Sequence, residues 1–484
     1  MSESIRNLEP RKVWEIFDEI NKVPRPSKKE EKIIAYLEEF ARKHSLRYKK
    51  DATGNVVMYK DATPSMEGRP TVVLQSHMDM VCEKNSDVEF DFMKDAIRTR
   101  IEDGWVKAEG TTLGADDGIG MATALAVMIS DDIEHPALEA LFTVDEETGL
   151  TGAFGLGRDM LTGKYLINLD SEDEGEIFIG CAGGVDTVAT FTYDAEPAPR
   201  GMAWLRAEIS GLNGGHSGDN INDGLANSNK LLARLLLSGN DRIGVRIGRF
   251  DGGNLRNAIP REAYAVFGVP AGRREEMLEI ARRLAANFAE EYKYTDPGVK
   301  LEIKDAEAPD MVIDESTQRM LLLALQSVAN GVLAMSRSMP GLVETSTNLA
   351  SVKFVGANTI VVTSSQRSSV ESAKVDAAST VGATFRLAGA RVEHSEGYPG
   401  WTPDPSGRLL KLSEEAYEKL FGKQPKVKAI HAGLECGLFL EKYPELEMIS
   451  VGPTLRGVHS PDERLEIATV DKFWKLLLEI LRTV

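Results

Sequence analysis

Two kinds of hydrophobic pattern alternate along the first third of the chain. Apolar residues recur at helical spacing over residues 11–20, 28–43 and 118–129, and Ser27 stands where a cap of the second helix is expected. Nearly continuous apolar runs lie between and after these stretches, over residues 55–59, 71–75, 138–144 and 164–169. Such runs are typical of strands that are buried on both faces of a sheet. The pattern predicts an α/β unit.

The pattern changes at about Val185. Residues 204–209 alternate between apolar and polar side chains, as a strand does in a sheet with one open face. Helical patterns separated by further strands follow, over residues 224–237, 274–292 and 315–330. We expect an α+β unit in this part of the chain.

A segment rich in Pro and Gly at residues 398–403 marks the end of this unit. The α/β pattern then returns, with helices and strands expected at residues 405–421, 426–430, from 434, at 447–451 and at the C-terminus. We therefore expect one catalytic α/β domain, formed by residues 1–184 and 395–484. Residues 185–394 form an inserted α+β domain.

Composition narrows the classes of function. A chain of 484 residues is too long for a single core, which agrees with two domains. The 57 Lys and Arg residues against 75 Asp and Glu residues give a net charge of −18, which argues against binding to nucleic acid or to an anionic membrane. No apolar run approaches the ~20 residues that span a bilayer. Without a secretion signal, and with three widely spaced cysteines, the chain is expected to be cytoplasmic.

Five segments place a histidine or a carboxylate at a predicted strand end or helix start. They are SHMD at residues 76–79, TTLGADDGIG at 111–120, TVDEETG at 143–149, INLDSE at 167–172 and GVHSPDE at 457–463. Open α/β sheets carry their functional groups beyond the carboxyl ends of the strands. Two histidines and three carboxylates are the ligand mix of a two-zinc hydrolytic site.

Three of these segments also have a plain structural interpretation. The tripeptide at 77–79 alone fits a surface loop, although His77 and Asp79 would share one face of a strand, where Asp79 could orient a metal-bound imidazole. Asp116 or Asp117 can simply cap the helix that follows. The acids at 145–147 can form a solvated loop, or one can bind a cation while its neighbour acts as a general base.

Taken in order, these segments and GGHSGDNI at residues 214–221 closely resemble the M20 metallopeptidase family. Within it, the chain resembles the aminoacyl-histidine dipeptidase branch, also called cytosol non-specific dipeptidase, from about Leu8 to the C-terminus. The resemblance implies a zinc-peptidase-like mixed sheet flanked by helices, with an inserted lid and dimerisation domain. It also implies a homodimer that hydrolyses unblocked dipeptides, Xaa-His dipeptides among the candidates.

The resemblance assigns the ligands of a metal site. It implies two Zn²⁺ ions per subunit, and the same ligands also suit Co²⁺ or Mn²⁺. By this resemblance His77 and Asp170 bind one ion, Glu147 and His459 bind the other, and Asp116 bridges both.

Two further residues of the same segments take roles by resemblance. Glu146 is similar to the family's general base, which takes a proton from metal-activated water, and Asp79 to the residue that orients His77. Asp117 stands where Asn is expected in many relatives. The metal and base positions otherwise follow the family pattern, so an active enzyme is expected.

Five residues outside these positions are candidates for the substrate site. His216 is similar to the family's oxyanion-stabilising histidine, which acts on the partner subunit's site, and Asn257 to a substrate contact. Arg367 has the fork geometry that clamps an α-carboxylate. His431 and Glu435 are four apart at an expected helix start, so both can face the substrate's amino end. From residues alone, His216 fits a glycine turn, Arg367 a surface strand, and the last two a core or capping role.

Three other functions remain as alternatives. An aminoacylase, tripeptidase or carboxypeptidase of the same family would share the metal site but not the substrate pocket. A non-catalytic binding protein on the same fold would lack a ligand or the base, and neither is missing here. A serine hydrolase is disfavoured because the chain has no GxSxG motif. The sequence predicts a di-zinc metallo-dipeptidase.

Overall fold

The computed structural model describes residues 4–484, and these residues form two compact units. Unit 1 comprises residues up to 180 together with 403–429 and 434–484, and unit 2 comprises residues 181–402 and 430–433. Unit 1 is therefore built from both ends of the chain. The sequence pattern places the boundaries a few residues away, at 184/185 and 394/395.

The main sheet of unit 1 is mixed, and its strands come from both ends of the chain. In spatial order they are β1 (Arg47–Lys50), β2 (Val56–Lys60), β6 (Leu138–Thr143), β3 (Val72–His77), β7 (Tyr165–Asn168), β23 (Glu447–Ser450), β8 (Glu176–Cys181) and β22 (Lys426–Ile430). The central strands β6, β3, β7 and β23 run parallel to one another. Their carboxyl ends consequently meet at one edge of the sheet.

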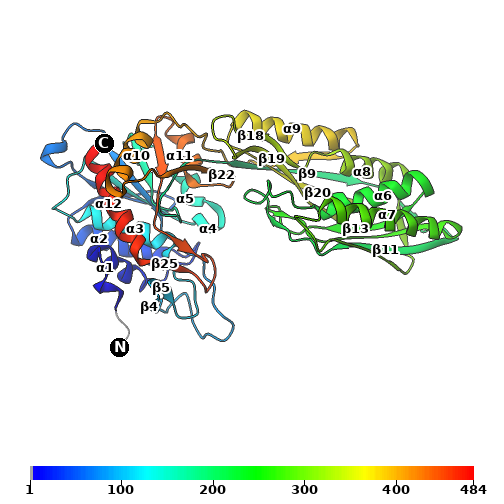
Figure 1. Cartoon of the computed structure of the whole chain (residues 1–484), viewed down its shortest axis with the longest axis horizontal. Helices are drawn as coiled ribbons and strands as arrows, with labels where there is room; N and C mark the ends of the chain where they lie inside the picture. The colour runs from blue at the N-terminus through cyan, green and yellow to red at the C-terminus, as the bar shows by residue number, and fades with distance from the viewer. Residues whose placement is uncertain (1–3) are drawn as a thin grey trace. The chain divides into compact units, whose positions relative to one another are not determined.

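Helices cover this sheet (Figure 1). They are α1 (Arg11–Ile20), α2 (Glu31–Lys43), α3 (Ala115–Met128), α4 (Glu146–Gly149), α5 (Thr151–Gly155), α10 (Arg408–Phe421), α11 (Glu435–Lys442) and α12 (Ile467–Thr483). α2 packs against β1 and β2, α3 against β3, β6 and α1, and α10 against β23 and α12. Every residue of β3 and of β6 is buried, as their apolar runs predict. The predicted α/β class is confirmed.

A smaller antiparallel sheet completes unit 1. Its strands are β24 (Leu455–Arg456), β25 (Arg464–Glu466), β5 (Trp105–Ala108) and β4 (Thr99–Glu102), in this spatial order. β24 pairs with β25, so residues 457–463 form the loop of a hairpin. The hairpin holds one of the candidate segments against the sequence-distant strand β5.

Unit 2 is an antiparallel sheet with helices packed on it. Its strands are β16 (Lys300–Asp305), β11 (Met202–Ser210), β15 (Ala263–Pro270), β13 (Arg246–Gly252), β19 (Val343–Val355), β20 (Thr359–Ser368), β9 (Gly183–Thr192) and β21 (Arg391–His394), with β18 (Gly331–Met335) beside β19. Its helices are α6 (Ser228–Ile243), α7 (Arg274–Glu291), α8 (Glu315–Ser327) and α9 (Glu371–Leu387). The short pairs β10 (Ala195–Pro197) with β17 (Met311–Ile313) and β12 (Gly215–His216) with β14 (Ala258–Ile259) lie outside this sheet. The predicted α+β class is confirmed.

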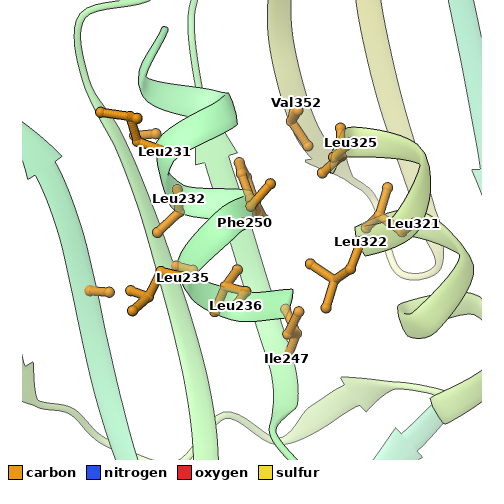
Figure 2. Close-up of a cluster of buried hydrophobic side chains, with 14 of the residues drawn as sticks. Leu231, Leu232, Leu235, Leu236, Ile247, Phe250, Leu321, Leu322, Leu325 and Val352 are labelled. Carbon is orange, nitrogen blue, oxygen red and sulfur yellow. The ribbon is translucent and has the colours of Figure 1, made fainter. Parts of the chain in front are cut away.

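The core of unit 2 lies between these helices and the sheet. α6 packs against α7 and α8, and α8 packs against α9. Figure 2 shows leucines of α6 and α8 that meet Ile247 and Phe250 of β13 and Val352 of β19. Phe250 is completely buried. This cluster holds the helices on the sheet by apolar contact.

Several helix boundaries differ from the prediction. α2 begins at Glu31 rather than at residue 28, because Lys28 adopts a positive φ of 63°. Ser27 is therefore no cap, and its hydroxyl donates instead to Asp79. α6 begins at Ser228 rather than at residue 224, because the side chain of Asn227 caps the N–H groups of residues 229 and 230.

Some elements were not predicted at all. The hydrophobic pattern predicts no bounds for β19, β20 or α9, although a strand at Arg367, in β20, is one interpretation of that residue. Among the described residues, no helix combines the length and apolar character that crossing a membrane requires.

Candidate metal centre

The carboxyl ends of the parallel strands in unit 1 carry most of the candidate ligands. His77 is the last residue of β3, and Asp170 follows the end of β7. Glu147 lies in α4, which follows β6. Asp116 stands in the first turn of α3, and His459 lies in the loop between β24 and β25. The structure brings these five predicted side chains together.

The five side chains form two groups that share Asp116. His77 Nε2 lies 3.0 Å from Asp116 Oδ1 and 3.5 Å from Asp170 Oδ1. His459 Nε2 lies 3.1 Å from Asp116 Oδ2 and 3.0 Å from Glu147 Oε2. In each group the candidate ligand atoms lie within 4.8 Å of one another. Asp116 thus directs one carboxylate oxygen to each group.

Added positive charge would stabilise these two groups electrostatically. Burial alone would lower the pKa of His77, but the carboxylates around it, Asp170 and Asp116 foremost, raise the pKa well above its ordinary value. Hydrogen bonds to Asp116 and Glu147 raise the pKa of His459 to about 11. Burial raises the pKa of Asp170 to about 7. A buried set of carboxylates is unfavourable unless cations offset it.

The donor chemistry fits divalent cations. Each group offers one imidazole nitrogen and two carboxylates, which are ligands that Zn²⁺, Co²⁺ and Mn²⁺ accept. Glu147 Oε1 is buried and has no hydrogen-bond partner in the described chain. A buried carboxylate oxygen without a donor is costly, and a metal ion would satisfy it.

Asp79 holds the end of β3 and the start of α4 together. It is fully buried, and its Oδ1 lies 3.3 Å from His77 Nδ1. The backbone N–H groups of Glu146 and Glu147 donate to Asp79 over 3.0 and 3.3 Å, and Ser27 donates over 2.7 Å. Burial would raise the pKa of Asp79, but its contact with His77 and these hydrogen bonds lower it. Asp79 is thereby placed to turn His77 Nε2 toward the shared carboxylate.

The three consecutive acids after β6 have three different environments. Asp145 has a positive φ of 51°, and its carboxylate accepts hydrogen bonds from the hydroxyls of Thr148 and Thr151. Glu147 faces His459. A carboxylate oxygen of Glu146 lies within 4.8 Å of ligand atoms of His77 and Glu147. Burial first, and then nearby negative charge, raises the pKa of Glu146 well above its ordinary value.

A chain of buried polar side chains crosses the parallel strands beside the ligands. Ser450 donates to Asn168 over 2.5 Å, and Asn168 donates to Gln75 over 2.6 Å. Gln75 donates to Glu435 Oε2 over 2.6 Å, and Thr143 donates to the same oxygen over 2.9 Å. The sequence analysis missed this chain, because it assigned no role to Gln75, Asn168 or Thr143, although the last two lie in segments that it singled out. The repeated spacing of Gln75 and Asn168, each two residues before a ligand, is the signal that could have found it.

One premise about Glu435 and His431 is wrong. α11 begins at Glu435, and Leu434 before it is extended. His431 therefore does not lie on the helix, and the two residues do not share a helical face. They also fall in different units, Glu435 in unit 1 and His431 in unit 2.

Unit 2 gathers two of the candidate substrate residues. Arg367 Nη2 lies 3.5 Å from His216 Nε2, and Arg367 Nη1 donates to the Tyr398 hydroxyl over 2.9 Å. Arg367 is 7% exposed, and its Nε atom is buried without a partner in the described chain. His216 Nδ1 lies 3.0 Å from Asp219 Oδ2. Arg367 therefore retains donor capacity in a polar cluster rather than lying on an open surface strand.

The other two candidates of unit 2 have separate contacts. His431 is buried, and its Nε2 lies 2.7 Å from Ser346 Oγ. Burial first, and then the positive charge of Arg367, lowers the pKa of His431 to about 4. The carbonyl of Asn257 accepts a hydrogen bond from the backbone N–H of Ser217, the residue after His216. That contact ties the segment of Asn257 to the segment of His216.

Comparison with known proteins decides the family. The model of peptidase family M20/M25/M40 matches residues 73–483. The chain belongs to this family. It is 41% identical over 484 residues to the cytosol non-specific dipeptidase of Escherichia coli (strain K12), with 100% of this chain and 99% of the relative covered. The predicted family and its branch are thereby confirmed, and with them an enzyme of the metallo-exopeptidase class.

Solved structures agree with this M20 assignment. The aminoacylhistidine dipeptidase from Vibrio alginolyticus superposes with a TM-score of 0.94 at 40% identity, covering 100% of this chain and 98% of that one. The aminopeptidase PepT from Bacillus cereus ATCC 10987 superposes with a TM-score of 0.56 at 18% identity, covering 98% and 99%. The second likeness concerns the fold alone. The predicted fold class, a mixed sheet flanked by helices with an antiparallel-sheet unit, is confirmed.

Proposed function

We propose that this M20 enzyme hydrolyses the peptide bond of unblocked dipeptides at a pair of divalent cations. The observation that carries the proposal is the geometry of Asp116, which presents one oxygen toward His77 and the other toward His459. A shared carboxylate between two nitrogen- and oxygen-rich groups suits a two-metal hydrolytic site. The full-length likeness to a dipeptidase supports the substrate class.

Five side chains would hold the cations. His77 and Asp170 would bind one ion, Glu147 and His459 the other, and Asp116 both. Zn²⁺, Co²⁺ or Mn²⁺ held there would supply Lewis acidity, which polarises a carbonyl group and lowers the pKa of water so that water can lose a proton near neutral pH.

Glu146 is the general base of the proposal. Its buried carboxylate lies beside the ligand atoms of His77 and Glu147, where it can accept a proton from the attacking water. The same carboxyl then donates this proton to the leaving amine.

The residues of unit 2 complete the proposal by family resemblance. Arg367 would bind the free α-carboxylate, and its unpartnered Nε supports this role. His216 would stabilise the oxyanion of the partner subunit's site in a homodimer, and Asn257 would contact the substrate. A fixed carboxylate sets the distance to one peptide bond, which explains exopeptidase action.

His431 and Glu435 are the remaining candidates for the substrate site. Contact of His431 and Glu435 with the substrate's amino end stays a prediction. The hydrogen bonds from Gln75 and Thr143 support a different role for Glu435, as an anchor of α11.

A cytosolic location follows the name of the Escherichia coli relative and is part of the proposal.

A substrate panel with metal removal tests the proposal. The protein is assayed on dipeptides, the same dipeptides with a blocked amino end, and tripeptides, before and after chelation and after Zn²⁺ is restored. We expect hydrolysis of unblocked dipeptides only, lost on chelation and regained with Zn²⁺. Preferred tripeptide hydrolysis would assign the chain to the tripeptidase alternative, and activity that survives complete chelation would overturn the metal mechanism.

A further inference from the structure

A carboxylate is bound by the loop that precedes α3. The N–H groups of Leu113 and Gly114 donate to Glu463 Oε2 over 2.7 and 3.0 Å. Those of Ala115 and Asp116 donate to Glu463 Oε1 over 2.8 and 3.4 Å. Glu463 is 2% exposed. Four consecutive backbone donors therefore surround one buried side chain, and both of its oxygens are used.

The conformation of Gly114 makes this arrangement possible. Gly114 has a φ of 67°, which turns successive N–H groups toward the same point. A Cβ atom at Gly114 would lie 2.6 Å from Arg25 Nη2 and 2.9 Å from Met80 Sδ. A side chain at this position would be strained by the backbone angle and would displace the side chains of Arg25 and Met80.

Arg25 holds the same loop from its carbonyl side. Its Nη2 donates to the carbonyl of Gly114, and its Nη1 donates to the carbonyl of Asp79 over 2.8 Å. Arg25 is 1% exposed. The loop thus lies between a buried carboxylate and a buried guanidinium. The guanidinium also reaches the backbone of Asp79, whose carboxylate contacts His77.

These contacts join the three segments that carry the histidines and the shared carboxylate. Glu463 and His459 lie in the same hairpin loop between β24 and β25. The N–H of Asp116 is the fourth donor to Glu463, so Glu463 links the backbone of the shared carboxylate to the loop of His459. Arg25 links the loop before α3 to the segment of His77 and Asp79.

We propose that Glu463 and Arg25 are positioning residues of the metal centre, which fix the separation of His459, Asp116 and His77. Neither residue binds the cations. The inference rests on the proposed function, because it presupposes the pair of cations. Replacing a residue that orients metal ligands without binding the metal commonly lowers metal affinity or activity about 10- to 100-fold.

Glu463→Gln is the sharpest variant. A glutamine has one acceptor oxygen and one donor NH₂ group, so it cannot accept from four N–H groups, and its NH₂ group would face backbone donors. Asp462→Asn is the matched control, since it removes the same charge from the neighbouring residue, which is exposed. Binding of Zn²⁺ to metal-free protein is titrated by calorimetry, and kcat and KM for a dipeptide are measured at fixed Zn²⁺.

We expect E463Q to bind Zn²⁺ about 10- to 100-fold more weakly. Its kcat should fall without a change in KM, and excess Zn²⁺ should restore kcat, whereas D462N should behave as the wild type. Wild-type affinity in E463Q would overturn the inference. If the wild type itself bound fewer than two ions, the proposed function would fail instead. Should E463Q not fold, as judged by thermal unfolding of metal-free protein, Glu463→Asp undergoes the same titration, and wild-type affinity there would overturn the inference equally.

Discussion

At the residue scale, neighbouring carboxylates take different roles because their surroundings differ. Asp145, Glu146 and Glu147 are consecutive acids, yet Asp145 takes two threonine hydroxyls, Glu147 faces His459, and Glu146 stays buried beside the ligands. The left-handed backbone at Asp145 turns the chain out of β6 and separates these directions. A sequence pattern gives the run of acids, but it does not give this turn.

Replacing Glu146 tests the division of roles among these acids. Glu146→Gln keeps the size of the side chain and removes its capacity to take up a proton. We expect kcat to fall about 10²- to 10⁴-fold, which is the usual contribution of a general base, while metal content stays unchanged. Steady-state kinetics and elemental analysis on the same sample check this. Glu445→Gln, at an exposed carboxylate, is the control, and near-normal turnover in E146Q would show that another group takes the proton.

The buried His431 predicts a pH dependence of stability. Its pKa is about 4 in the folded chain against an ordinary value of 6.5. Between these values the unfolded chain binds more protons, so stability is lost as the pH falls from about 6.5 toward 4. The lowered pKa corresponds to at most about 3 kcal/mol.

His431→Asn removes this titration. The difference in unfolding free energy between the wild type and H431N should shrink or reverse as the pH falls from 7 to 4. Denaturant unfolding of both proteins across this range measures the difference. A difference that does not vary with pH would mean that His431 does not keep a low pKa in the folded protein.

At the element scale, the sequence predicts what apolar burial dominates. The runs at 55–59, 71–75, 138–144 and 164–169 correspond to β2, β3, β6 and β7, because strands buried on both faces must be apolar almost throughout. β19 and β20 escape prediction because they bury Ser, Thr and Gln. These polar groups pair with one another, as Thr345 does with Ser368 and Gln366 with Thr187. The pattern of a single strand does not show which partners satisfy such groups.

The core between α6, α8 and the sheet should dominate the stability of unit 2 (Figure 2). Phe250→Ala removes a completely buried ring, and we expect the free energy of unfolding to fall by about 3–5 kcal/mol. Leu387→Ala, at a leucine that is 83% exposed, should change it by less than about 0.5 kcal/mol. Denaturant unfolding measures both variants, and equal effects would place the core elsewhere.

Two variants of Glu435 distinguish an anchor of α11 from a contact to the substrate. Burial raises the pKa of Glu435 to about 8, so the carboxyl is mostly protonated at neutral pH and resembles a glutamine. As an anchor, Glu435→Gln should leave stability and KM unchanged. Glu435→Ala should lower stability by about 1–3 kcal/mol, because it leaves the buried donors of Gln75 and Thr143 unpaired.

The same two variants also test the alternative role of Glu435 as a contact to the substrate. If Glu435 binds the amino end of the substrate as a carboxylate, E435Q raises KM while stability stays unchanged. Parallel measurement of KM and thermal unfolding therefore distinguishes the anchor from the substrate contact.

At the scale of the whole molecule, the candidate site depends on chain topology. His459 lies far from His77 in sequence, and it reaches the site because β23 pairs with β7 and the β24–β25 hairpin pairs with β5. The family resemblance supplied the ligand set from ordered motifs. It assigned no role to Glu463, although Glu463 ends the segment at 457–463, nor to Arg25 or to the chain from Ser450 to Glu435. Their roles arise from contacts between segments that are distant in sequence, which a motif does not show.

The central claim is that five side chains hold two cations with Asp116 between them. Anomalous diffraction at the zinc edge from crystals of the Zn²⁺-loaded protein tests it most directly. The account predicts two peaks in each chain, one between His77, Asp116 and Asp170, and the other between Asp116, Glu147 and His459. A single peak, or peaks away from Asp116, would contradict it.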